Sequence, residues 1–446
     1  ILAGAVQDTG RGILLGANGF IYNIATGQYT LMNVNGSYDN LTSLYGIWQV
    51  HGHDPYEFLR HGNDTLGYYQ WLPAYFIDGD MRTMYWAHAL GNGVSLSMFT
   101  LGVAVLEAPF FLLGHWAAWA FGYTQDGFTA PYGVSMMVGC AMYAGIGSVF
   151  TFRLARRFSS TLPALLAVLV LFGATNLFRY CVYEPTMSHL FSWMLITVYA
   201  WCGLRILDGP RPLHVFVLVS TGLLVLLIRQ TNAFSLLFPL LVAGSWDGLK
   251  RFFSHLFQHP WALTAGVLIG LVPWVLQMIY WHSITGDLIT FTYGKKEEHF
   301  HWDKLALGLV LFSFRNGWLV YSPFFMAVLA MLFRRAWQGV RPARTIVFLT
   351  LSCLIVYSAW WCWWLGSGFG HRGFVDLYGL LAIPTAWLMG AVMQRPFALR
   401  LALTVGIAVL IQLNFALTDR YDWWWSSEAW TWQRFWEQVG AIARGE

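Results

Sequence analysis

Long apolar runs separated by short polar segments dominate the pattern of this chain from residue 132 onwards. Most runs are close to the roughly 20 residues that a helix needs to cross a bilayer. They cover 132–152, 161–178, 187–204, 213–228, 233–246, 261–281, 317–333, 345–365, 377–393 and 401–417. The pattern predicts ten membrane-spanning helices here, of which 233–246 is short.

The pattern is weaker before residue 132. Residues 12–32 are rich in glycine and only weakly apolar, and we interpret them as a first span. A second apolar stretch, 94–121, is interpreted as one or two interfacial helices on the outer surface, with Trp116 and Trp119 in the aromatic belt. Counting 94–121 as a span would place the arginine-rich segment 153–157 on the outer side of the membrane.

The expected fold is therefore all-α, a polytopic membrane protein of about 10–11 transmembrane helices. Four parts are predicted along the chain. They are a possible first transmembrane helix within 1–32, a first outer loop with interfacial helices over 33–131, a transmembrane helical domain over 132–418 that includes an outer loop at 283–316, and an aromatic-rich outer tail at 419–446.

Composition agrees with a membrane protein. The chain is 57% hydrophobic and only 11% charged, whereas soluble domains carry about 25% charged residues. Its net charge of +4 is accounted for by arginines in short loops, so a nucleic-acid partner has no support. The five cysteines fall inside or beside apolar runs without metal-type CxxC spacing, and we expect them to be packing residues.

Basic residues are distributed unevenly between the two ends of the predicted spans. Half of the 26 lysines and arginines lie in five short loops, which contain only two acids, Asp208 and Asp247. These loops are 153–157, 205–212, 247–259, 334–344 and 394–400. The positive-inside rule makes them cytoplasmic, so carboxylate chemistry is expected on the opposite face.

The segment YEPTMSHLFS, residues 183–192, places Glu184 and His189 between two apolar runs. An ionisable group at the edge of a bilayer is costly, which makes Glu184 a functional candidate. Its alternative role is to cap the following helix, because Glu-Pro-Thr suits a first helical turn. We expect His189 to be a hydrogen-bonding core histidine rather than a metal ligand, since no second ligand accompanies it at suitable spacing.

Two arginines interrupt the apolar pattern in tight outer turns. Arg229 lies in IRQTN, where it predicts either an anion site or a side chain that snorkels to the interface. His371 and Arg372 follow a glycine-rich turn, whose backbone N–H groups can approach a phosphate. A structural Arg372–Asp376 ion pair is the alternative.

Two acids stand out in the first outer segment because their neighbours are aromatic or apolar. Asp64 precedes Tyr68 and Tyr69, and Glu107 lies alone in LEAPFFLL. Charges in such surroundings are expensive unless they serve a purpose. We therefore treat Asp64 and Glu107 as candidate site residues, with Tyr68 and Tyr69 as candidate substrate contacts.

The order of these motifs resembles the GT-C superfamily of polytopic glycosyltransferases, which use polyprenyl-phosphate-linked sugars, and a bacterial group within it most of all. The resemblance covers about residues 62–420. The segments that carry it are GYYQWLPAYF, VAVLEAPFFLL, EPTMSHLFS, IRQTN, RNGWLVYSP and WWCWWLGSGFGHRGFVD. Two features depart from the family pattern, because the first span is poorly formed and no adjacent acid pair follows it.

The resemblance implies roles for three acids. Asp64 stands where the family has its first-loop catalytic acid, Glu107 where relatives have a residue lining the site, and Glu184 where they carry a second acid. It also implies a bacterial cytoplasmic membrane as the location, with the site facing the periplasm. The acceptor would be a glycan, a lipid or a protein.

The favoured hypothesis is a transferase that moves a sugar from a polyprenyl phosphate carrier to an outer acceptor. A carboxylate base would take the acceptor proton, and Arg229, Arg372 and His371 would stabilise the departing phosphate. His189 would support the site. This scheme requires no cofactor and no metal.

Two other functions remain open. Intramembrane arginines and acids also mark the path of a transporter or flippase for a lipid-linked or anionic substrate, although no inverted repeat supports this reading. The other is a non-catalytic membrane subunit of a larger complex, because a fold can persist without activity.

The charge asymmetry generates a testable topology. We expect loops 153–160 and 334–344 to be cytoplasmic and 283–316 to be external. Single cysteines placed in each loop should react with a membrane-impermeant maleimide in intact cells only at 283–316. Labelling of 334–344 from outside would contradict the predicted orientation and the outer location of the site.

Overall fold

The computed structural model describes residues 64–91, 93–293 and 298–445, Leu59, and the backbone of four strands between residues 13 and 41. The described part of the chain is mostly helical (73%). The protein is a mainly helical, multi-pass membrane protein, as predicted. It folds as two compact units, one formed by 1–139 with 280–292 and the other by 140–279 with 293–446.

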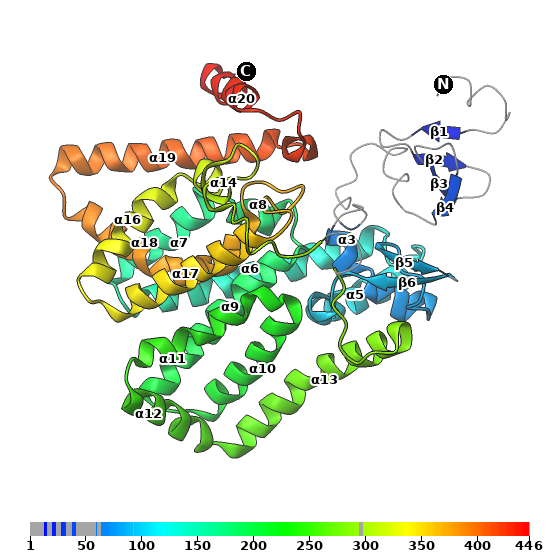
Figure 1. The fold of residues 1–446 in the computed structure, drawn as a ribbon, viewed down its shortest axis with the longest axis horizontal. Coiled ribbons are helices and arrows are strands. Elements are labelled where there is room, and N and C mark those ends of the chain that lie inside the picture. Colours follow the sequence, from blue (N-terminus) through cyan, green and yellow to red (C-terminus); the bar gives the residue numbers. More distant parts are fainter. Residues whose placement is uncertain are drawn as a thin grey trace. The chain divides into compact units, whose positions relative to one another are not determined.

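The first unit begins with an antiparallel sheet. Its strands β1 (Ile13–Leu15), β2 (Phe20–Asn23), β3 (Gln28–Met32) and β4 (Tyr38–Leu41) pair in sequence order (Figure 1). The predicted span over 12–32 is therefore wrong for its described parts. Short alternating segments such as FIYN and QYTLM separated by glycines favour strands and turns over one continuous helix.

Short helices and a hairpin follow, and then one long helix. The elements are α3 (Asp64–Tyr69), α4 (Trp71–Pro73), the π-helix η2 (Ala74–Asp78), strands β5 (Ala87–Gly91) and β6 (Val94–Ser97), and α5 (Gly102–Phe121). The predicted interfacial stretch 94–121 thus begins as a strand and continues as a single helix. Helix α5 is also long and apolar enough to cross a membrane.

Helices form almost all of the second unit. They are α6 (Ala130–Arg156), which begins in the first unit, α7 (Thr161–Gly173), α8 (Leu177–Val182), α9 (Ser188–Asp208), α10 (Pro212–Ile228), η3 (Gln230–Leu237), α11 (Phe238–Ala243), α12 (Trp246–Phe257), α13 (Pro260–Thr285), α14 (Leu307–Phe312), α15 (Trp318–Tyr321), α16 (Phe324–Trp337), α17 (Arg341–Ala359), η4 (Arg372–Leu377), α18 (Tyr378–Met393), α19 (Phe397–Arg420), η5 (Trp423–Ser426) and α20 (Trp432–Arg444). Each of the ten predicted apolar runs contains a helix.

The helices differ in length and in burial. Within the described chain, seven are long and apolar enough to span a membrane: Gly102–Phe121, Ala130–Arg156, Ser188–Asp208, Pro260–Thr285, Arg341–Ala359, Arg372–Met393 and Phe397–Arg420. Three shorter apolar helices, Thr161–Gly173, Pro212–Ile228 and Gln230–Ala243, occupy other predicted spans. The run 317–333 is divided between α15 and α16 at Ser322 and Pro323, because proline disfavours a helical conformation in the residue before it.

Helix α9 is the centre of the second unit. It is buried along nearly its whole length, whereas α13 and α19 expose most of theirs. It packs on α10, α11, α12, α18 and η4, and Figure 1 shows α9 beside α10 and α11. Small residues permit this close packing: a Cβ added at Gly379 of α18 would lie 1.8 Å from Oγ1 of Thr197 in α9.

We expect Gly379→Ala to destabilise the protein by about 1–3 kcal/mol, because the added methyl group overpacks the α9–α18 contact. Gly390→Ala is the matched control on the same helix, where the new Cβ would meet nothing nearer than 3.7 Å. Thermal unfolding in detergent should show a lower midpoint for the first variant only. Equal midpoints would contradict the close approach.

Candidate functional site

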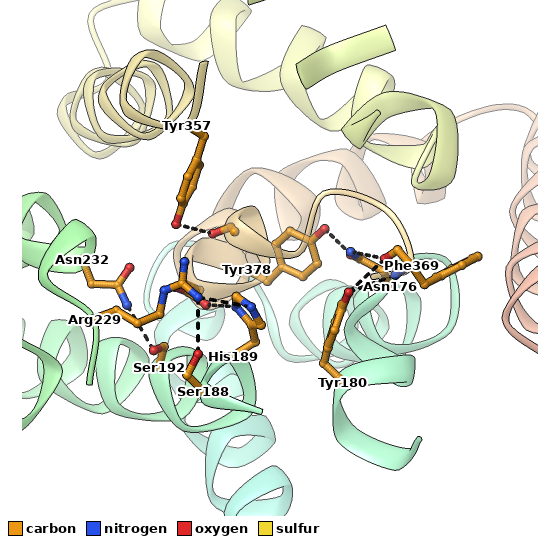
Figure 2. A network of polar contacts seen from close by, with 12 residues as sticks. Asn176, Tyr180, Ser188, His189, Ser192, Arg229, Asn232, Tyr357, Phe369 and Tyr378 are labelled. Atoms are coloured by element: carbon orange, nitrogen blue, oxygen red, sulfur yellow. Dashed lines mark hydrogen bonds and ion pairs between the residues drawn. The ribbon is translucent and has the colours of Figure 1, made fainter. Parts of the chain in front are cut away.

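A buried ionic cluster joins three elements of the second unit. Asp376 of η4 accepts from His189 Nδ1 at 2.8 Å, and Arg229 Nε lies 3.5 Å from the other carboxylate oxygen of Asp376. Arg229 Nη1 lies 3.3 Å from both His189 Nε2 and Ser188 Oγ. Figure 2 shows Arg229 and His189 side by side within this network. The three groups thus form a closed ring of contacts.

Local structure explains how these side chains meet. His189 is in the first turn of α9, and Arg229 is the extended residue that ends α10, with φ −151° and ψ 113°. A 3₁₀-helix follows Arg229, and Asn232 within it donates to Ser192 Oγ at 3.1 Å (Figure 2). The tight turn IRQTN therefore folds back onto the start of α9.

Burial makes the pairing obligatory. The side chains of His189 and Asp376 are each 1% exposed, and that of Arg229 is 17% exposed. Taking an isolated charge out of water is expensive, so Asp376 needs the opposite charge of Arg229. With Nδ1–H of His189 donated to Asp376, Nε2 is left to accept from Arg229, and a neutral imidazole satisfies both neighbours.

Asp376 has partners that the sequence analysis did not name. We considered an Arg372–Asp376 pair, but the partners of Asp376 are His189 and Arg229. The sequence feature that pointed to Asp376 was its position as an isolated acid at the end of GHRGFVD, directly before the apolar run 377–393. Its true partners lie far away in the sequence, and local spacing does not reveal them. The expectation that His189 is a hydrogen-bonding core histidine agrees with this geometry.

Arg372 lies in the same polar region. The charges of Arg229 and Arg372 both act on His189, and that of Arg372 also acts on Tyr180. The rings of Tyr180 and His189 are 5.2 Å apart. Of the two arginines predicted to share a site, Arg229 contacts His189 directly, at 3.3 Å.

His371, the third predicted phosphate contact, is uncharged. Its side chain is fully buried against Tyr357 and Phe374, and Nε2 donates to the Trp363 carbonyl at 2.9 Å. Burial lowers the pKa of His371 to about 3. Its Nδ1 has no hydrogen-bond partner among the described residues, so His371 offers an acceptor nitrogen rather than a positive charge.

The glycine-rich turn before His371 is held by side-chain amides. Asn176 Nδ2 donates to the Phe369 carbonyl at 3.0 Å, and Asn316 Nδ2 donates to the Trp364 and Gly366 carbonyls at 2.9 Å each. The Phe369 N–H donates to Tyr180 Oη at 3.1 Å (Figure 2). These contacts position the turn, and they already use the Phe369 N–H that could otherwise face a phosphate.

Glu184 does not cap the next helix. Helix α9 begins at Ser188, and Glu184 instead forms an ion pair with Arg179 at 2.8 Å. Arg179 also donates to the Thr418 carbonyl at 3.1 Å and lies 4.3 Å from the ring centroid of Tyr421. Glu184 thus contributes to a contact between α8 and the end of α19.

The first unit holds the other predicted acids. Glu107 is 1% exposed, and neither of its carboxylate oxygens has a hydrogen-bond partner within the part of the chain that the structure describes. It lies on the buried face of α5, between Val103 and Phe111. Helix α3, which begins at Asp64, packs against α5, and this brings the two acid-bearing helices together.

Tyr68 and Tyr69 are core residues in this unit. The Tyr68 ring lies 4.6 Å from that of Phe99, and Tyr69 donates its hydroxyl proton to the Gly127 carbonyl. Both side chains are buried. They pack in the core of this unit, and their predicted contact with substrate stays a prediction.

The predicted site residues therefore fall into two groups. Asp64, Glu107, Tyr68 and Tyr69 belong to the first unit, and Glu184, His189, Arg229, His371 and Arg372 to the second. That all of them face one cavity stays a prediction. Over the described residues, no cluster of three or more histidine, cysteine or acidic side chains has the geometry of a metal site.

Comparison with protein-family models, with curated proteins and with solved structures found no match.

The ionic cluster generates a stability prediction. Arg229→Met should destabilise the protein by about 3–5 kcal/mol, because it leaves Asp376 charged and buried without its partner. The double variant Arg229→Met/Asp376→Asn should recover part of that loss. Denaturant unfolding in detergent measures both.

The control is Arg157→Met, which breaks the exposed Arg157–Asp208 pair, whose side chains are 40% and 33% exposed. Its cost should not exceed about 1 kcal/mol. A loss in Arg229→Met no larger than in this control would show that the cluster contributes little.

Proposed function

We propose that this protein is a membrane-embedded glycosyltransferase that moves a sugar from a polyprenyl phosphate carrier to an acceptor outside the cytoplasmic membrane. In this reaction the acceptor oxygen forms a bond to the anomeric carbon, and the bond from that carbon to the phosphate oxygen breaks. The acceptor proton passes to a carboxylate, and polyprenyl phosphate leaves. The reaction needs a positioned base and positive charge near the phosphate.

The observation that carries this proposal is Glu107. A carboxyl group that is 1% exposed, with no hydrogen-bond partner among the described residues, is costly to maintain. Such a group in an apolar helix is a functional candidate, because packing alone would favour an apolar side chain. Its helix packs against α3, whose first residue is the second acid, Asp64.

We assign different roles to Asp64 and Glu107 because their side chains differ in solvent exposure. Asp64 is half-buried at the start of α3 and can exchange a proton with an acceptor, so we assign it the base. Glu107 is fully buried and is assigned to binding sugar hydroxyls or supporting Asp64. That Arg229 and Arg372 of the second unit hold the phosphate of the carrier stays a prediction.

A second candidate is a non-catalytic membrane subunit, and one observation favours it. Arg229 and Glu184 are both engaged in ion pairs within the protein, with Asp376 and Arg179. Charges used in this way hold helices together without any substrate. In a non-catalytic subunit, the ion pairs would explain Arg229 and Glu184, and the burial of Glu107 would still need an explanation.

The test is a transfer assay on the full protein in membrane vesicles, supplied with polyprenyl phosphate carrying radiolabelled hexose or pentose. Asp64→Asn and Glu107→Gln should each reduce the release of polyprenyl phosphate, by roughly 10²–10⁴-fold for the base. Asp287→Asn removes an exposed acid of the same unit and should leave the rate unchanged.

Two outcomes would contradict the proposal. Full activity in both acid variants would remove these residues from the reaction. Wild-type vesicles that release no polyprenyl phosphate from any donor would favour the non-catalytic subunit.

A further inference from the structure

Helix α12 carries an aromatic strip that is exposed on the surface of the described chain. Trp246, Phe253 and Phe257 are 70%, 44% and 63% exposed. Their spacing, i, i+7 and i+11, places them on one side of a helix. Ser245 caps the helix by accepting from the Gly248 N–H at 3.0 Å. The aromatic strip is therefore presented by a well-formed helix.

The opposite sides of α12 are already assigned. Phe252 is buried, and His255 Nδ1 contacts the Ile206 carbonyl at 2.6 Å, which ties α12 to the last turn of α9. Lys250 and Arg251 are exposed: Lys250 borders the aromatic strip, with Nζ 5.8 Å from the Trp246 ring centroid, and Arg251 lies further round the helix. The helix thus has a face toward the protein and an exposed side on which the aromatic strip is bordered by basic residues.

The next helix limits where the aromatic strip can be. Helix α12 ends at Phe257 and α13, a candidate span, begins at Pro260, so only two residues separate them. The first turn of α13 exposes Trp261 by 86%. Tryptophan at the end of a span is typical of the headgroup level of a bilayer, and α12 must lie at that level too.

The surrounding charge is positive. The last turn of α9, to which α12 is tied, includes Arg205 and ends at Asp208. Asp208 pairs with Arg157, which directly follows α6, and Arg153 and Arg156 lie in the last turn of that helix. This end of the bundle therefore presents several arginines together with Lys250 and Arg251.

We propose that α12 is an in-plane helix that inserts Trp246, Phe253 and Phe257 into the membrane interface and binds anionic phospholipid headgroups through Lys250 and Arg251. An aromatic strip beside a basic strip suits this partner, because the apolar side enters the acyl boundary while the cations meet lipid phosphates. The inference does not depend on the proposed transferase activity.

The first test measures depth. Spin labels on Phe253→Cys and Ser254→Cys sample adjacent positions on different sides of α12, in protein reconstituted into phosphatidylcholine vesicles with phosphatidylglycerol. The five native cysteines are buried, and the protein without added cysteine gives their background. We expect relaxation by oxygen to dominate at 253 and relaxation by a water-soluble nickel chelate to dominate at 254. Equal water exposure at both positions would overturn the insertion of α12.

The second test measures lipid choice. Titration of phosphatidylglycerol into detergent-solubilised protein, followed by native mass spectrometry, should show roughly tenfold weaker binding for Lys250→Gln/Arg251→Gln. Arg434→Gln/Arg444→Gln removes the same number of charges from α20, another amphipathic helix, and should have little effect. Equal losses in both variants, or no loss in either, would overturn the headgroup site.

Discussion

The ion pair between Arg229 and Asp376, with His189 in contact with both, is the interaction on which the second unit depends. It is an expensive arrangement in apolar surroundings, since each charge is stable there only while the other is in place. Because the three side chains come from α9, the end of α10 and η4, the same requirement fixes where these elements meet. The tight turn after α10 carries Arg229 into this contact, and Asp376 reaches it from η4.

Close helix packing complements this polar contact. Several small residues let bulky neighbours approach: Gly379 meets Thr197, Gly147 meets Trp193 and Gly203 meets Pro239. In a bilayer the hydrophobic effect does little to bring helices together, so such packing and a few interior polar contacts supply the association energy. Helix α9 has both, which explains why it is nearly enclosed while α13 and α19 remain exposed.

Buried charged residues that have a partner and buried charged residues that have none among the described residues need different explanations in this protein. Asp376, Arg229 and Glu184 have partners, and structural need accounts for them. Glu107 has no hydrogen-bond partner within the described residues, and nothing in the packing of α5 requires a carboxyl group there. This contrast is why the proposed chemistry depends on Glu107 of the first unit, whereas packing accounts for the paired charges of the second.

The sequence by itself determined that this is a multi-pass helical membrane protein, because the apolar content of some 20 consecutive residues is a local property. It also indicated which charged residues were out of place, Glu107, Glu184, Arg229 and Arg372 among them. Only the tertiary structure decided their partners: Asp376 took His189 and Arg229, Glu184 took Arg179, and His371 was buried in a neutral state. The described parts of segment 12–32 formed strands, since their weak apolar character suits either state until neighbouring strands pair with them. Pairing joins residues far apart in the chain, and hydropathy and spacing carry no information about which distant side chain will satisfy a buried charge.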